Sequence, residues 1–142
     1  MRPVAFPKTA RSWKRSRRRK RAAAAGVAAA TIWGLQEPLD QRVFRCGFSD
    51  IALLGKAVGR GRAAGFAIHA VNGAIFGLAF DELRERVPIG PRKLAVAAAL
   101  GEHLALYPLF YFIDRPLLKN PRAFAQETWR HLLFGLVLGR LA

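Results

Sequence analysis

The chain has 142 residues and a net charge of +15, yet hydrophobic residues make up 52% of it. A uniformly basic soluble domain would mix its charged and apolar residues, but here ten of the 24 lysines and arginines lie between Arg2 and Arg21. The length predicts one domain, and a single cysteine, Cys46, excludes an internal disulfide.

Residues 1–21 form a basic segment that contains the run RSWKRSRRRKR. A block of like charges repels itself, so this tail is predicted to be disordered. It could bind nucleic acid or anionic lipid, or it could be the positive flank that holds a first membrane span in place. The role as the positive flank of a membrane span is favoured over binding of nucleic acid or lipid, because an apolar stretch follows the basic segment directly. The expected contacts with anionic lipid are Arg17, Arg18, Arg19, Lys20 and Arg21.

Residues 22–39, AAAAGVAAATIWGLQEPL, carry no charge before Glu37 and reach the lower length limit of a helix that spans a bilayer. A cleaved signal peptide is the competing interpretation, but the basic region is long for one and no clear cleavage site follows. Asp40, at the end of this segment, is expected at a solvated interface. Further along, Ser49 predicts the cap of a short helix that Gly59 ends.

Three longer helices are predicted after that, at residues 63–86, 94–113 and 122–142. The second of them ends in aromatic residues, as is typical of a membrane interface. Asn120 followed by Pro121 predicts the start of the last helix. Its first turns are polar, so it can span a bilayer only if these residues face the other helices or the interface. Glu127 and His131 are expected to form a pair within it.

These elements predict an all-α fold, a four-transmembrane-helix bundle of two similar helical hairpins at residues 22–142, behind the disordered tail at 1–21. The basic tail places the N-terminus in the cytoplasm, and four spans return the C-terminus to the same side. Richness in alanine, arginine, glycine and leucine is typical of a GC-rich bacterial genome. The predicted location is therefore a bacterial plasma membrane, as a multi-pass protein.

The pattern His-x3-Gly-x3-Gly occurs twice, in HAVNGAIFG from His69 and in HLLFGLVLG from His131. Residues at i, i+4 and i+8 lie nearly on one helix face. In lipid, small residues on such a face let helix backbones approach closely. The repeat predicts two hairpins related by a pseudo-two-fold axis along the membrane normal. Packing contacts are expected at Gly26, Gly34, Gly73, Gly77, Gly101, Gly135 and Gly139.

At 1.5 Å of rise per residue, the three histidines and one glutamate fall at similar depth near the middle of the predicted bilayer. This polar layer comprises His69, Glu102, His103 and His131. Three roles are open for it: hydrogen bonds between helices, a path for protons or ions, and a haem or transition-metal site. The last would use His69, His103 and His131. No compact metal-binding spacing occurs, which favours a protein without a cofactor.

The sequence contains no glycine-rich phosphate loop and no nucleophile elbow, so no enzymatic activity is indicated. The predicted function is an integral membrane protein that handles a small solute or protons or has a structural role. The alternatives are a nucleic-acid-binding protein that uses the tail, and a membrane protein that binds haem or metal. The expected partners are the lipid bilayer and a second copy of the chain, with no specific nucleic acid and no protein partner indicated.

The doubled motif, over about residues 22–142, resembles the YagU-like group of small bacterial four-helix inner-membrane proteins. The segments WGLQEPLDQR and NPRAFAQETWRHLLFG are similar to an actinobacterial membrane protein family. Both resemblances imply a membrane location and a four-helix fold, and neither implies an activity.

Overall fold

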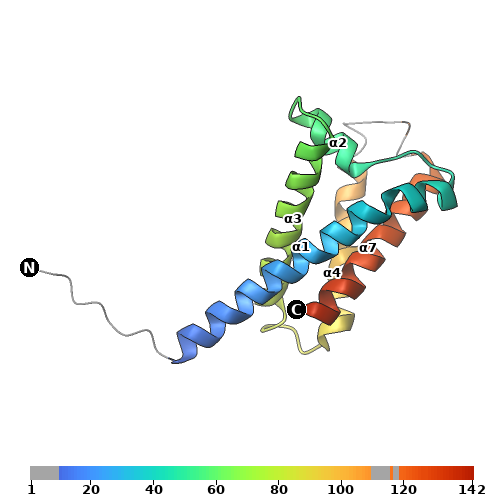
Figure 1. Cartoon of the computed structure of the whole chain (residues 1–142). Helices are drawn as coiled ribbons and strands as arrows, with labels where there is room; N and C mark the ends of the chain where they lie inside the picture. Colours follow the sequence, from blue (N-terminus) through green and yellow to red (C-terminus); the bar gives the residue numbers. More distant parts are fainter. Residues whose placement is uncertain (1–9, 110–115, 117–118) are drawn as a thin grey trace, which may run out of the picture.

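A computed structural model describes residues 10–109, 116 and 119–142. Its regular elements are helical, which confirms the prediction of an all-α fold (Figure 1). The α-helices are α1 (Ala10–Phe44), α2 (Asp50–Ala57), α3 (Arg62–Leu83), α4 (Pro91–Leu106) and α7 (Pro121–Leu141), and a 3-10 helix, η1 (Tyr107–Leu109), follows α4.

The four long helices pack as two antiparallel pairs, α1 with α3 and α4 with α7 (Figure 1). This is the pairing into hairpins that the sequence predicted. The two pairs are joined because α1 also crosses α7, and the short helix α2 packs against α3. The apolar core lies where α1, α4 and α7 meet, around Trp33, Ala99, Phe134 and Leu138.

Within the described residues, only α3 is long and apolar enough to cross a membrane. The predicted four-transmembrane bundle and multi-pass topology are therefore not supported. The physical reason differs between the helices. Helix α4 has only 16 residues. Helix α7 carries Glu127 and Arg130 among its apolar residues, and the apolar part of α1 lies between a basic run and Glu37.

The prediction that the tail is disordered is wrong for residues 10–21, because α1 begins at Ala10 and runs for 35 residues. Acidic side chains at the end of α3 neutralise the charge that was expected to unfold this segment. Arg18 pairs with buried Asp81 at 2.9 Å, and both Arg15 and Arg19 pair with Glu82 at 3.1 Å. Residues 1–9 lie outside the described part of the chain.

The predicted caps are confirmed. The Ser49 hydroxyl accepts a hydrogen bond from the Ala52 amide at 3.0 Å, and Asn120 accepts one from the Arg122 amide at 3.0 Å. Gly59, with a φ of 65°, lies just after α2. The helix predicted over 94–113 instead ends at Leu106, and its residues 110–113 lie outside the described part.

Glycine lets the paired helices approach to backbone contact. A Cβ atom added at Gly26 of α1 would lie 1.9 Å from the Gly73 carbonyl oxygen of α3. A Cβ added at Gly77 would lie 2.1 Å from the Ala22 carbonyl oxygen. In the second pair, Gly135 and Gly139 contact the backbone of α4 in the same way. Both predicted ladders therefore face the first helix of their own hairpin.

The other two predicted packing glycines differ from this pattern. Gly34 faces the side chains of Phe66 and Ile51 rather than a backbone. The prediction for Gly101 is wrong, because no atom of the described residues lies within 4 Å of a Cβ placed there. Helix α4 buries Ala95 and Ala99 instead, on a face turned away from Gly101.

Candidate functional site

A cavity of about 300 Å³ lies between α3 and α4, with α1 and α7 also contributing to its wall. All four residues of the predicted polar layer line it, so the structure brings them to one place. Helix α2 and η1 close the end near the α1–α2 connection. The polar and aromatic lining residues are Trp33, Asp50, His69, Asn72, Phe76, Glu102, His103, Tyr107, Glu127, His131 and Phe134.

Hydrogen bonds fix the protonated nitrogen of two imidazoles. The Thr128 hydroxyl donates to the Phe124 carbonyl at 2.8 Å, so its oxygen is left to accept from His103 Nε2 at 3.0 Å. His131 Nδ1 lies 2.8 Å from the Glu127 carbonyl oxygen, which can only accept. His103 Nδ1 and His131 Nε2 therefore carry no hydrogen in the neutral rings. The expected pair of His131 with Glu127 is thus made with its backbone.

His69 follows the same arrangement. One ring nitrogen bonds to the backbone of Ala30, and its buried Nε2 has no hydrogen-bond partner in the described residues. Burial of a charged imidazole without a counter-ion is costly, so the neutral ring is favoured. Each of the three histidines is thus held by one hydrogen bond and keeps one bare acceptor nitrogen.

Aromatic rings hold the imidazoles in place. The Trp33 indole packs edge-on against both His69 and His131, with ring centroids 5.0 and 4.7 Å apart. His103 lies 4.8 Å from His131 and 5.3 Å from Tyr107. The positions of the three imidazoles are therefore coupled through one continuous set of ring contacts.

The geometry does not favour the alternative of a haem or metal site. In the part of the chain that the structure describes, no group of three or more His, Cys, Asp or Glu side chains could hold a metal ion. Haem ligation by His69 and His131 together would require Trp33, which is only 5% exposed, to leave its position against both rings.

A buried ionic cluster forms the charged end of the site. Arg130 of α7 is 0% exposed and its guanidinium contacts four carboxylates. They are Asp40 at 2.7 Å, Glu127 at 2.8 Å, Asp50 at 3.1 Å and Glu37 at 3.8 Å. Arg62 adds a second cation, 2.6 Å from Glu37, and Gln126 donates to Asp40 at 2.7 Å. Asp50 and Glu127 line the cavity as well.

Sequence reasoning missed this cluster. Asp40 was expected at a solvated interface, but it is 2% exposed and bonded to Arg130. The available signal was spacing. Glu37 and Asp40 lie three residues apart, as do Glu127 and Arg130, and each pair occupies one helix face beside apolar residues.

This cluster contains more acidic than basic side chains, since four carboxylates face two guanidinium groups. Burial raises the pKa of Asp50 from an ordinary 3.8 to about 6; Arg130 opposes this increase and Glu37 adds to it. Folded Asp50 therefore keeps its proton to about pH 6, whereas the unfolded chain releases it near pH 4.

The contribution of Asp50 to the free energy of unfolding is expected to fall as pH rises from 4 to 6, because the folded state keeps the proton of Asp50 in this window. The difference between 3.8 and about 6 corresponds to at most about 3 kcal/mol. D50N, whose amide oxygen can still accept from Arg130, lacks this contribution, so its advantage or deficit in stability relative to the wild type should change between pH 4 and pH 6. Unfolding followed by circular dichroism at several pH values measures this. E85Q, which removes a carboxylate far from the cluster, should behave like the wild type, and an unchanged slope in D50N would contradict the assignment.

The predicted lipid-contact residues fall into two groups. Arg17 and Lys20 are exposed on α1. Arg18 and Arg19 instead pair with the acidic end of α3, and Arg21 Nε donates to the Leu141 carbonyl at 2.8 Å. Part of the basic segment therefore holds the ends of α3 and α7, in addition to any contact with lipid.

Comparison of the chain with protein-family models, curated proteins and solved structures gives no match. The resemblance to the YagU-like group therefore stays an expectation, and the functional argument rests on the geometry of the cavity.

Proposed function

We propose that the protein is an integral membrane protein that holds a small solute in the histidine-lined cavity. The observation that carries this proposal is the convergence of all three histidines on one cavity inside a bundle with an apolar outer surface. Ligand sites of this kind occur between the helices of bundles and combine apolar walls with a few oriented polar groups.

The distribution of polarity in α1 supports a lipid environment. Leu35 and Leu39 are 71% and 64% exposed, whereas Glu37 and Asp40 on the same helix are buried. In water, the reverse arrangement would be favoured. In lipid, ionisable residues face the interior of the bundle, and exposed apolar side chains contact acyl chains at no cost.

The other helices carry the same kind of surface. Val71 and Ile75 of α3, the helix with the length and composition of a span, are 58% and 60% exposed, and Leu104 of α4 is 61% exposed. An apolar surface of this extent on a monomer indicates a membrane or a partner.

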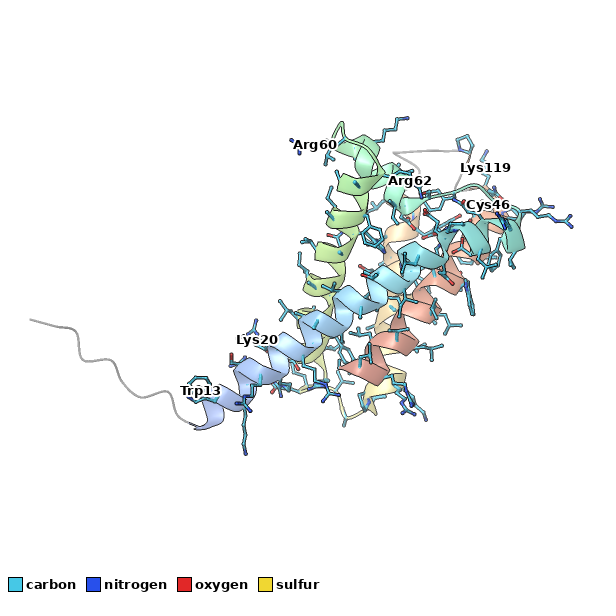
Figure 2. The ribbon with its side chains drawn as sticks, viewed as in Figure 1. Trp13, Lys20, Cys46, Arg60, Arg62 and Lys119 are labelled. Atoms are coloured by element: carbon cyan, nitrogen blue, oxygen red, sulfur yellow. The ribbon has the colours of Figure 1, made fainter. Side chains whose placement is uncertain are left out.

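Charged side chains gather at the two ends of the molecule. Figure 2 shows Trp13 and Lys20 in the N-terminal part of α1, far from Arg60, Arg62 and Lys119 at the opposite end of the molecule. Because the end near Lys20 carries the basic run of α1, we place it on the cytoplasmic side. The cavity, with the Arg130 cluster at one end, then lies between the two charged ends.

Cysteine accessibility in native membranes tests this proposal. In a C46A background, L106C places a thiol on the cavity wall, and L104C places one two residues away on the apolar outer surface. A charged, water-soluble methanethiosulfonate reagent should modify L106C at least about 10-fold faster, because the thiolate that reacts forms only where water has access.

Leu104 is the more exposed of the two side chains in the isolated molecule, so a water-soluble protein predicts the opposite order of rates. Faster modification of L104C would therefore reject the membrane location. Protection of both thiols would reject an open, hydrated cavity.

A further inference from the structure

We propose that the cavity takes a small organic cation with N–H donors, of the class of a protonated arylalkylamine. This inference rests on the proposed function and adds the chemistry of the ligand. Three independent properties of the wall carry it: the hydrogen-bond polarity of the imidazoles, the balance of charge, and the aromatic surface.

The histidines offer acceptors only. The protonated nitrogens of His103 and His131 bond to Thr128 and to the Glu127 carbonyl, which leaves a bare nitrogen on each ring. His69 Nε2 is buried and has no partner in the described residues. A buried acceptor without a donor is costly, so a ligand that brings N–H groups gains hydrogen bonds that the protein lacks.

The charge on the wall is negative. Asp50, Glu102 and Glu127 line the cavity, and none of the described lysines and arginines does. Arg130 compensates Asp50 and Glu127 from outside the cavity. Glu102 of α4 forms no ion pair with any described residue. Burial without a counter-ion disfavours the charged form of Glu102, and an ammonium group beside it would supply the missing counter-charge and stabilise the carboxylate. An anion would gain no such partner on this wall.

Four aromatic residues contribute to the apolar part of the wall, together with four leucines. Trp33 and Tyr107 contact the imidazoles, and Phe76 and Phe134 pack edge-to-face with centroids 5.2 Å apart. Aromatic faces attract cations and pack well against an aromatic ligand. At about 300 Å³, the cavity lies at the lower end of the range for small-molecule sites, which limits the ligand to a small molecule.

Four probes that share one phenyl ring separate these properties: benzylammonium, benzyltrimethylammonium, benzyl alcohol and benzoate. Binding is measured by equilibrium dialysis on the full chain in lipid nanodiscs. Benzylammonium should bind tightest, the trimethylated cation more weakly because it has no N–H donors, and benzoate least.

E102Q removes the uncompensated charge and keeps the shape of the side chain. It should weaken benzylammonium about 10- to 100-fold, as expected for loss of a charge-assisted hydrogen bond, and should leave benzyl alcohol unchanged. The control, E85Q, also removes one carboxylate, but from the exposed turn that follows α3, and should have no effect on either probe. Circular dichroism confirms that both variants fold.

Equal binding of benzylammonium and benzyl alcohol, or equal loss in E102Q and E85Q, overturns the cation assignment and leaves the solute cavity in place. Failure of all four probes to bind while L106C remains accessible also overturns it. Failure of all four together with protection of L106C rejects the proposed function itself.

Discussion

Replacement of Arg130 by leucine is expected to lower the free energy of unfolding by about 3–5 kcal/mol, the largest effect of any single substitution proposed for this chain. Arg130 is fully buried and is the cation shared by four carboxylates on α1, α2 and α7. Without it, Arg62 alone opposes these four acids, and carboxylates buried without a partner must either bind protons or draw water into the bundle.

Denaturant titration of the purified protein in detergent, followed by circular dichroism, measures the change. R122L is the matched control, because Arg122 lies on the exposed face of the same helix and loses the same group. It should change stability by no more than about 0.5 kcal/mol. R130L in combination with E127L, which also removes an acid, should recover part of the loss. Equal stability of R130L and R122L would contradict a structural role for the cluster.

The second large effect is expected at the contact between α1 and α3. G26A should destabilise the protein by about 1–3 kcal/mol or more, because its new methyl group would lie 1.9 Å from the Gly73 carbonyl oxygen. No side-chain rotation relieves a clash between a Cβ atom and a backbone, so the two helices must move apart and the neighbouring contact at Gly77 is lost as well.

G101A makes the same chemical change in α4 with the opposite expected sign. In the part of the chain that the structure describes, nothing lies within 4 Å of the added methyl group, and alanine favours a helix over glycine by up to about 1 kcal/mol. The two variants, measured in the same denaturant titration in detergent, therefore separate the effect of helix packing on the free energy of unfolding from the effect of helix propensity. A stabilising G26A, or a destabilising G101A of similar size to G26A, would show that the assignment of the packing faces is wrong.

The error at Gly101 illustrates how far a periodic pattern can be taken. The sequence contains small residues at helical spacing on two faces of α4, one with Ala97 and Gly101 and one with Ala95 and Ala99. The spacing of small residues alone does not predict which of the two faces packs against another helix. The packing face of α4 depends on its partner helix, α7, whose Gly135 and Gly139 approach α4 on the second face.

The polar layer could be predicted more easily, because the rise per residue gives the position of each side chain along its own helix. The pairing of helices, read from the two ladders, then brought His69, Glu102, His103 and His131 to one cavity. The bonds that leave one bare nitrogen on each imidazole could not be anticipated, because they depend on the rotation of each ring against its neighbours.

By itself, the sequence determined the helical class, the caps at Ser49 and Asn120 and the two hairpins. Each of these depends on interactions within one or two helical turns or on a pattern repeated in adjacent segments. Only the tertiary structure decided the order in residues 10–21 and the cluster around Arg130. Most of the ion pairs in these two regions join residues 63 to 93 positions apart, and the burial that decides which of these pairs form exists only after the helices have packed.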